Sequence, residues 1–177
     1  MDVVGGLVER LSGKPLDEFL HERIFEPLRM VDTGYFVRPE NRHRLAGCYE
    51  RDANRNWVRS RRFWADEYET PPRLRGGGFG LASTMSDYMR FLQMLLNGGE
   101  LEGARLLSPK TIELILSDNL PAGVEMFFNY GYGLGFSPLK DRIRGGRLTS
   151  TGTAGGGGVA NTVFGLDRAD DITWMVW

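Results

Sequence analysis

The clearest periodic pattern of the chain runs from residue 85 to residue 96. Large apolar side chains recur there at intervals of three and four, so a helix would place them on one face. They are Met85, Tyr88, Phe91, Leu92, Leu95 and Leu96. The hydroxyls of Ser83 and Thr84 can cap the first turn, and the Asn-Gly-Gly that ends at residue 99 favours a left-handed stop. The sequence therefore predicts a helix over residues 85–96.

Two shorter helices are predicted before this one. The first has four apolar residues on one helical face, followed by the C-cap candidate Gly13: Val4, Leu7, Val8 and Leu11. The second covers roughly residues 15–24, because Pro15 suits a first helical turn. Pro27 sets its end, since a proline disfavours helical geometry in the residue before it. We therefore expect Glu26 to lie outside the helix.

Another helix is predicted to begin at Ser108 and Pro109, which are preferred residue types for an N-cap and a first helical position. It would end near Ser117. Its inward face would carry Ile112, Ile115 and Leu116.

A glycine alternation follows this helix. Large side chains alternate with glycines at Tyr130, Tyr132, Leu134 and Phe136. The alternation predicts a strand with large groups on one face and a bare face opposite, which indicates close packing or a nearby ligand.

The end of the chain predicts a hairpin. Residues 161–166 and 172–177 are strand-like and are joined by a polar five-residue connection. The second of these segments is a nearly unbroken apolar run, typical of a strand covered on both faces. We therefore expect a covering segment that follows Trp177.

Residues 35–74 show weak periodicity, with arginines interleaved among acids, so we predict a long surface loop. Its aromatic residues are expected to anchor it to the core, or in one case to line a substrate cleft: Trp57, Phe63, Trp64 and Tyr68. The alternative for residues 59–64, with three arginines and two aromatics, is a patch for an anionic ligand or nucleic acid. The neighbouring acids favour a solvated loop.

Composition narrows the function classes. The 177 residues fit one domain, and 22 basic against 23 acidic side chains give no electrostatic reason to expect nucleic acid or a membrane surface. The one cysteine, Cys48, excludes an internal disulfide, and His21 and His43 are too few for a structural zinc cluster. We predict no metal and no membrane span, and we find no secretory signal at the start.

The segment from residue 75 to residue 109 carries a family resemblance. Its pattern comprises the glycine run, Leu-Ala-Ser-Thr at 81–84, Asp-Tyr at 87–88, Arg-Phe at 90–91, Met-Leu-Leu-Asn-Gly-Gly at 94–99 and Arg-Leu-Leu-Ser-Pro at 105–109. A companion pattern comprises Asp-Val-Val-Gly at 2–5, Val-Glu at 8–9, Ser-Gly at 12–13, Phe-Glu-Pro-Leu at 25–28 and Met-Val-Asp-Thr at 30–33. Together they resemble the serine β-lactamase-related family, which includes class C β-lactamases, penicillin-binding proteins and esterases.

The resemblance implies an α+β fold of the β-lactamase/transpeptidase type, in which an antiparallel sheet is flanked by helices. Residues 1–177 would then be the carboxy-terminal part of a single domain, truncated at both ends. The family uses a Ser-x-x-Lys at a helix start, a Tyr-x-Asn or Ser-x-Asn element and a Lys-Thr-Gly-like strand. Its nucleophile, lysine and tyrosine are expected before Met1.

Two literal matches to these motifs are interpreted as decoys. Ser137 and Lys140 fit Ser-x-x-Lys, but the residues after them cannot continue an apolar helix. Ser117, Asp118 and Asn119 fit Ser-x-Asn, but they come before the Ser-x-x-Lys and at a predicted helix end, where turn chemistry explains them. We assign no catalytic residue in this chain.

The third motif has the strongest candidate remnant, in the glycine-rich residues 151–158. Two registers compete, one that starts at Thr153 with Gly155 as its third residue, and one formed by Gly156 and Gly157. Neither has the family's cationic or aromatic first residue, so the backbone could lie along a substrate without a side-chain contribution. We predict these four residues as substrate-binding, and a loop without function is the alternative. A dinucleotide site is rejected because no helix is expected after residue 158.

The resemblance implies that the parent protein is a serine hydrolase that cleaves an amide or ester through an acyl-enzyme, with a small-molecule substrate and no cofactor. The chain alone is expected to be inactive because the nucleophile segment lies elsewhere. The alternative is a non-catalytic module of the same fold that binds a ligand or partner. Lactamase, peptidase and esterase activities are not separated by this sequence, and neither compartment nor oligomeric state is predicted.

Overall fold

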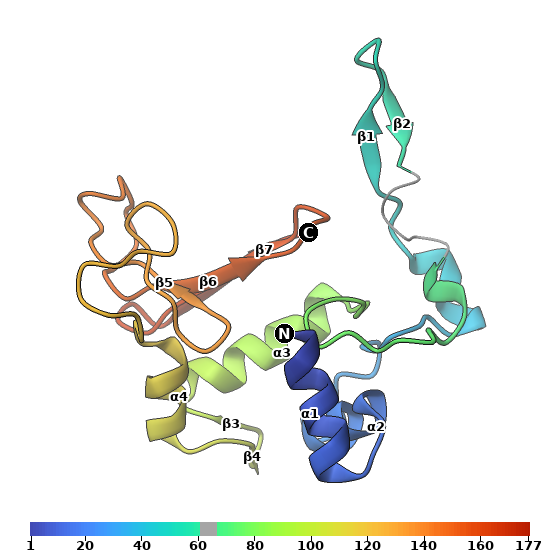
Figure 1. Cartoon of the computed structure of the whole chain (residues 1–177), viewed down its shortest axis with the longest axis horizontal. Helices are drawn as coiled ribbons and strands as arrows, with labels where there is room; N and C mark the ends of the chain where they lie inside the picture. The colour runs from blue at the N-terminus through green and yellow to red at the C-terminus, as the bar shows by residue number, and fades with distance from the viewer. Residues whose placement is uncertain (61–66) are drawn as a thin grey trace. The chain divides into compact units, whose positions relative to one another are not determined.

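A computed structural model describes residues 1–60 and 67–177. They form two compact units, Met1–Asp87 and Tyr88–Trp177. Figure 1 shows the helices α1 and α2 in the first unit and the strands β5 to β7 in the second. No helix in the described part of the chain combines the length and apolar character needed to cross a bilayer.

The first unit begins with the two helices that the sequence predicts. Helix α1 (Asp2–Ser12) ends at Gly13, whose φ of 70° gives the expected left-handed cap. Helix α2 (Leu16–Leu20) continues directly into the π-helical turn η1 (His21–Phe25). The prediction for Glu26 is wrong, because its φ of −64° and ψ of −51° are helical.

The segment stays helical past Pro27 because tertiary packing outweighs the local preference. The Leu28 N–H donates to the Ile24 carbonyl at 3.1 Å, and the Leu28 side chain is fully buried. The chain reverses only at Arg29, which has a φ of 54°.

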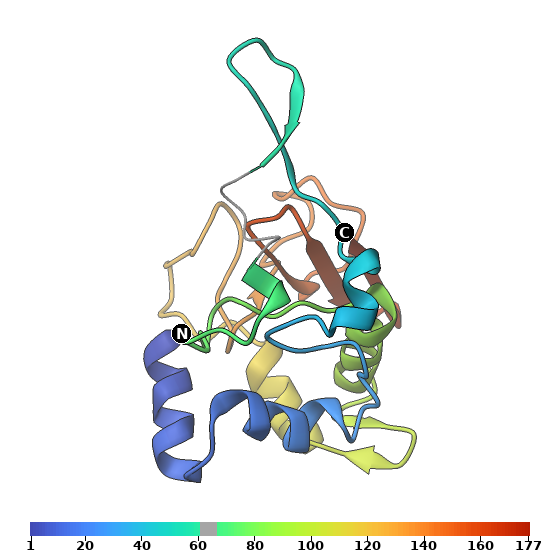
Figure 2. The same ribbon diagram turned by 90° about the vertical axis from the view of Figure 1, so that its right-hand side faces the viewer.

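The expected surface loop contains more regular structure than predicted. It has the 3-10 turns η2 (Pro39–Arg44) and η3 (Glu67–Glu69) and an antiparallel hairpin of β1 (Tyr49–Arg51) and β2 (Trp57–Arg59). The Asp52 carboxylate fixes the hairpin turn by accepting bonds from the N–H groups of Asn54 and Asn56. Figure 2 shows the hairpin, in teal, as a projecting ribbon.

Two of the four predicted aromatic anchors, Trp57 and Tyr68, lie among the described residues. Trp57 is 65% exposed with the Arg51 guanidinium 4.6 Å above its ring, so its anchoring role was wrongly predicted. Tyr68 is half-buried, and its carbonyl accepts a bond from the Val37 N–H. Phe63 and Trp64 lie outside the described residues, as do Arg61 and Arg62 of the alternative anionic-ligand patch.

Helix α3 (Met85–Leu96) has the predicted bounds, and the Thr84 hydroxyl caps it by accepting the Asp87 N–H at 3.2 Å. Leu92 and Leu95 are buried as expected, but Met85 is half exposed. After the small hairpin of β3 (Glu100–Leu101) and β4 (Ala104–Arg105), helix α4 (Pro109–Leu116) begins at the predicted Ser108 cap.

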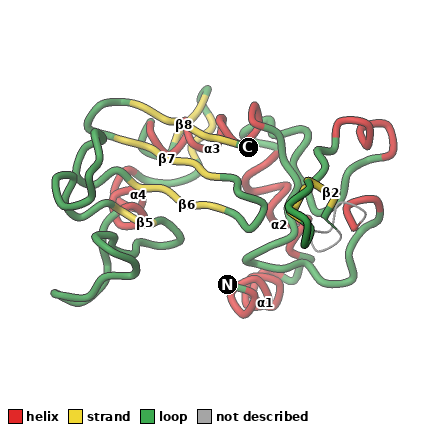
Figure 3. Tube along the Cα trace, turned by 90° about the horizontal axis from the view of Figure 1, so that it is seen from above, coloured by secondary structure: helices red, strands yellow, loops and turns green. Residues whose placement is uncertain are grey.

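The sheet of the second unit is antiparallel, with the order β5-β6-β7-β8 (Figure 3). Its strands are β5 (Ser137–Pro138), β6 (Ala154–Gly157), β7 (Val163–Asp167) and β8 (Ile172–Val176). The predicted hairpin is confirmed as β7 and β8. Tyr88 packs on this sheet, with its ring centroid 5.0 Å from that of Phe164, and burial raises the pKa of Tyr88 to about 12.

The predicted strand over residues 130–136 is wrong. The chain there makes a tight reversal, in which Gly131 donates to the Pro138 carbonyl at 2.9 Å and Gly133 to the Phe136 carbonyl at 2.8 Å. The expected close packing is nevertheless present. A Cβ atom at Gly133 would overlap with the carbonyl oxygen of Ile115, at the end of α4. The glycines therefore fit the reversal against a helix end and do not line the face of a strand.

Candidate functional site

The glycine-rich segment that the sequence singles out forms strand β6. On one side β7 pairs with its whole length, from Ala154↔Leu166 to Gly157↔Val163. On the other side the β5 register reaches only Ala154 and Gly155. Gly156 and Gly157 therefore extend beyond β5, at a sheet edge where an extended substrate could pair with the backbone.

A buried carboxylate fixes the turn that leads into β6. Asp167, at the end of β7, is 2% exposed. One of its oxygens, Oδ2, accepts the Thr153 hydroxyl at 2.7 Å and the Ser150 N–H at 2.7 Å. The other, Oδ1, accepts the N–H groups of Ala169 and Asp170. We call Asp167, Thr153 and Ser150 the β6 clamp.

Hydrogen bonds to the Asp167 carboxylate determine its ionisation state. Burial alone would raise the pKa of Asp167, but the bonds from Ser150, Thr153, Asp170 and Ala169 outweigh it and hold this pKa below the usual value. The carboxylate is therefore charged at neutral pH. A cavity of about 530 Å³ lies beside the clamp, and Lys140, Thr151 and Asp167 are among its lining residues.

The two sequence registers place different residues at the start of the motif. The Thr153 side chain is 8% exposed, and its hydroxyl donates to Asp167 and to the Ser150 carbonyl, so it points into the unit. A Cβ atom at Gly156 would lie 3.0 Å from the Phe164 ring, which occupies the space that a side chain there would need. In both registers the backbone of Gly156 and Gly157 is what faces the open edge.

Residues of both literal motif matches line the cavity beside the clamp, but their polar side chains bond to partners outside the β6 clamp. Ser137 lies in β5, not in a helix, and its hydroxyl contacts Met126 Sδ. Lys140 forms an ion pair with Asp118 at 2.9 Å and donates to the Val124 carbonyl. The Ser117 hydroxyl bonds the Glu113 carbonyl at the end of α4, which is the predicted turn chemistry. These contacts are structural, and the absence of a catalytic role for either match stays a prediction.

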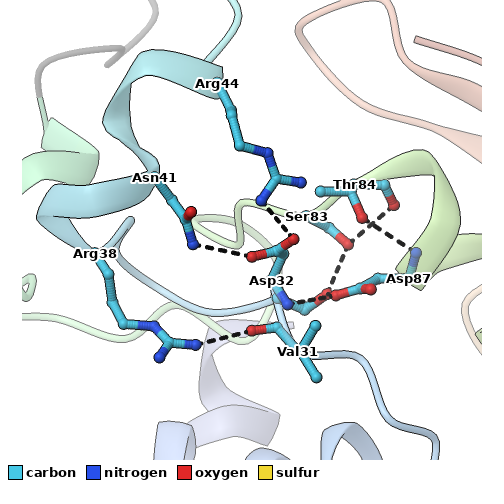
Figure 4. A network of polar contacts seen from close by, with 9 residues as sticks. Val31, Asp32, Arg38, Asn41, Arg44, Ser83, Thr84 and Asp87 are labelled. Carbon is cyan, nitrogen blue, oxygen red and sulfur yellow. Dashed lines mark hydrogen bonds and ion pairs between the residues drawn. The ribbon is translucent and has the colours of Figure 1, made fainter.

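A polar network in the first unit was not predicted from the sequence (Figure 4). Asp87, which is 4% exposed, accepts the Asp32 N–H at 2.7 Å and the Thr33 hydroxyl at 2.9 Å. The Asp32 carboxylate in turn holds Arg44 at 2.7 Å and Asn41 at 3.1 Å.

This network borders a cavity of about 460 Å³. The bonds that Asp87 accepts from Asp32 and Thr33 tie the turn after η1 to the start of α3 (Figure 4). Among the described residues, no group of three or more histidine, cysteine, aspartate or glutamate side chains could hold a metal ion.

Comparisons with known proteins agree with this architecture. The model of the Beta-lactamase family matches residues 1–177. Protein Rv1367c of Mycobacterium tuberculosis is 33% identical over 166 residues, which are 88% of this chain and 40% of that protein. The lovastatin esterase of Penicillium rubens is 29% identical over 199 residues, with 97% of this chain and 47% of the relative covered.

A solved simvastatin synthase, the LovD6 mutant of LovD from Aspergillus terreus, superposes on 99% of this chain. The TM-score is 0.82 at 25% identity, and the match covers 47% of the solved chain. The predicted α+β fold with an antiparallel sheet flanked by helices is therefore confirmed. The chain spans less than half the length of each of these relatives. With a family model matched along its whole length, the chain belongs to the β-lactamase family.

Proposed function

We propose that this chain supplies the sheet and one wall of the cleft of a serine hydrolase that cleaves an amide or ester through an acyl-enzyme, without a cofactor. The observation that carries the proposal is strand β6, whose Gly156 and Gly157 extend beyond β5 at an open sheet edge. Thr153, Gly155, Gly156 and Gly157 are the proposed substrate-binding residues.

The proposed role of β6 is to position an acyl group by its backbone. A strand edge offers alternating N–H donors and C=O acceptors, which can bind a planar amide or ester and the oxyanion that forms from it. The β6 clamp supports this role, because Asp167 fixes Thr153 and with it the start of the strand. Gly155 lets β6 approach β7 closely, since a Cβ atom there would overlap with the Phe164 carbonyl oxygen.

In this proposal the nucleophilic serine and its lysine come from a segment outside residues 1–177. The Ser137 and Lys140 contacts support it, because these two side chains bond to different partners and not to each other. Serine attack requires a base that accepts the hydroxyl proton. We therefore expect residues 1–177 alone to be inactive, and we propose that they form part of one longer domain.

The experiment compares residues 1–177 with a longer polypeptide that includes the in-frame upstream genomic sequence. Each is mixed with a chromogenic β-lactam and a short-chain nitrophenyl ester, and intact mass is recorded. We expect no turnover by residues 1–177, and in the longer polypeptide an acyl adduct on an upstream serine. An adduct on Ser137, lost in Ser137→Ala, would overturn the proposal. Absence of any adduct in the folded longer polypeptide would instead favour the non-catalytic module.

A glycine pair tests the role of β6 in the longer polypeptide. Gly156→Ala places a methyl group against the ring of Phe164, its partner in β7, and so shifts the strand that carries the open edge; we expect acylation to slow by about tenfold or more. Gly6→Ala, in α1 with no atom within 4 Å of the new methyl group, is the matched control and should acylate normally. Equal rates for Gly156→Ala and the control would remove β6 from the site.

A further inference from the structure

Two neighbouring turns of the second unit, around residues 124–129 and 141–147, are joined by one buried side chain. Asn129 is fully buried with a φ of 65°, and its side-chain amide donates to the Asp141 carbonyl. The backbone carbonyl of Asn129 accepts the Lys140 N–H at 3.0 Å. An ion pair between Glu125 and Arg144 crosses between the same two turns. The two turns therefore form one connected structure.

The joined turns present large apolar side chains to solvent. Phe127 and Phe128 are 65% and 67% exposed, Ile143 is 77% exposed, and Leu148, directly after the second turn, is 99% exposed. We call these four residues the apolar tip. Large exposed apolar side chains on neighbouring turns can mark an interaction surface.

Hydrogen bonds hold the backbone that carries the apolar tip. Phe127 and Tyr130 form a bridge, and the Asp141 carboxylate accepts the Ile143 N–H at 2.8 Å. The exposure of Phe127 and Ile143 thus follows from a hydrogen-bonded turn structure, which would hold these side chains in place during binding.

Basic residues are frequent in the same stretch of chain as the apolar tip. Residues 118–150 contain four basic residues (Lys140, Arg142, Arg144 and Arg147) and three acidic ones (Asp118, Glu125 and Asp141), a local net charge of +1 in a chain with a net charge of −1. Lys140 pairs with Asp118 and Arg144 with Glu125. Arg144 lies 4.8 Å above the Phe128 ring. Arg142 and Arg147 are exposed, and within the described residues neither forms an ion pair.

Phenylalanine and aliphatic side chains beside arginines are suited to binding an anionic lipid bilayer. At an anionic bilayer, apolar groups enter the boundary between head groups and acyl chains, and arginines bind the lipid phosphates. Figure 1 shows the gold-to-orange loops of this region gathered beside β5, at one end of the sheet. Side chains at the tips of turns can enter a bilayer without any rearrangement of the sheet.

We propose that the apolar tip and its arginines dock this unit onto an anionic lipid surface. The contact is interfacial and reversible, because four apolar side chains and a few cations give modest affinity compared with a membrane span. This docking is independent of the proposed hydrolase activity, since none of the residues involved belongs to β6 or to the β6 clamp. The balanced charge of the whole chain conceals this local basic surface.

The test uses the 177-residue chain and sucrose-loaded vesicles, made either of equal parts phosphatidylglycerol and phosphatidylcholine or of phosphatidylcholine alone. We expect sedimentation with the anionic vesicles to exceed that with neutral vesicles several-fold. The double variant Phe127→Ser/Phe128→Ser should lose about tenfold or more in affinity for anionic vesicles, because each buried ring contributes strongly. Arg142→Gln/Arg147→Gln should remove most of the preference for anionic lipid.

Leu11→Ser is the matched control, because Leu11 is 78% exposed on α1, in the other unit. It should bind vesicles normally, and circular dichroism should show each variant folded. No sedimentation of the original chain, or equal sedimentation of the phenylalanine double variant, would overturn the proposal. A dimer in size-exclusion chromatography that needs Phe127 and Phe128, without vesicle binding, would overturn it too and assign the surface to a second copy.

Discussion

Residues 76–78 and residues 155–158 are both glycine runs, and each packs closely against backbone of its own unit. In the first run a Cβ atom at Gly77 would lie 2.5 Å from the Met1 carbonyl oxygen, and the Gly78 N–H donates to the Asp2 carboxylate. In the second run a Cβ atom at Gly155 would overlap with the carbonyl oxygen of Phe164. One run joins a loop to the start of a helix, and the other is a strand of a sheet.

The difference shows what a glycine run can indicate by itself. In both places the residue type excludes a side chain where two backbones approach. The groups that face each glycine run determine its structural role. The loop of residues 76–78 is held by side chains, such as Tyr35, whose hydroxyl donates to the Gly76 carbonyl at 2.7 Å. Strand β6 is paired along one side and leaves Gly156 and Gly157 beyond β5 on the other.

The largest effect is expected at Gly155. Gly155→Ala should lower the free energy of unfolding by about 2–3 kcal/mol, because the opposing Phe164 carbonyl belongs to a paired strand and cannot move without breaking the β6–β7 ladder. Urea denaturation followed by tryptophan fluorescence measures the loss. A change below about 0.5 kcal/mol would mean that β6 is not packed as closely as residues 76–78.

The β6 clamp gives the next effect. Asp167→Asn should cost about 1–3 kcal/mol, because it removes charge-assisted bonds at a buried site. The lowered pKa of Asp167 also gives a pH dependence: its contribution is complete above the usual pKa of a carboxyl group and is lost as pH falls through the lowered, folded-state pKa.

Stability of the original chain and of Asp167→Asn should therefore converge in acid. Unfolding measured from neutral to strongly acidic pH checks this convergence. Asp171→Asn is the control, since Asp171 is exposed in the β7–β8 turn with a φ of 56°, which asparagine tolerates. A constant difference between Asp167→Asn and the original chain across this range would show that the carboxylate charge is unimportant.

A smaller effect is expected at Gly77. Gly77→Ala should cost about 1–2 kcal/mol, less than Gly155→Ala, because one bond from the Gly5 N–H holds the Met1 carbonyl, whereas Phe164 belongs to a strand paired on both sides. Thermal unfolding of both variants under the same conditions checks the order. The reverse order would show that the loop run, and not the strand run, is the more tightly packed of the two.

The smallest effects separate two adjacent glycines of α1. Gly6→Ala should stabilise by about 0.5–1 kcal/mol, because alanine favours a helix and no atom lies within 4 Å of the new methyl group. Gly5→Ala should lack this gain, since its methyl group would lie 3.0 Å from Leu16 Cδ2 and 3.1 Å from Gly77 Cα. Helicity and melting temperature measure both, and an equal gain at both positions would contradict the packing of residues 76–78 on α1.

The elements that could be predicted are those whose cause is local. Helix α3 follows from apolar spacing, the Thr84 cap and the glycines at its end, all within about one element's length. The reversal at residues 130–136 could not be predicted, because its glycines fit the end of α4 and not a strand face. A strand with one bare face and a reversal packed against a helix end would both show glycine alternation, so periodicity alone does not distinguish them.

The candidate site also has a part that could be predicted from the sequence and a part that could not. The glycine-rich β6 was visible in the sequence, but the β6 clamp was not, because Thr153 and Asp167 are 14 residues apart and meet only when β6 pairs with β7. The Asp32–Asp87 contact, across 55 residues, had no sequence signal beyond a carboxylate in the first turn of a helix.

The sequence by itself determined the positions of the helices, the β7–β8 hairpin, the glycine-rich strand candidate and the family resemblance, because each depends on residues close together in the chain. Only the tertiary structure decided which glycine run is strand and which is loop, how Asp167 holds Thr153, and that Phe127, Phe128 and Ile143 are exposed on two joined turns. These features depend on which backbones approach each other after folding, and the spacing of residues along the chain does not specify those approaches.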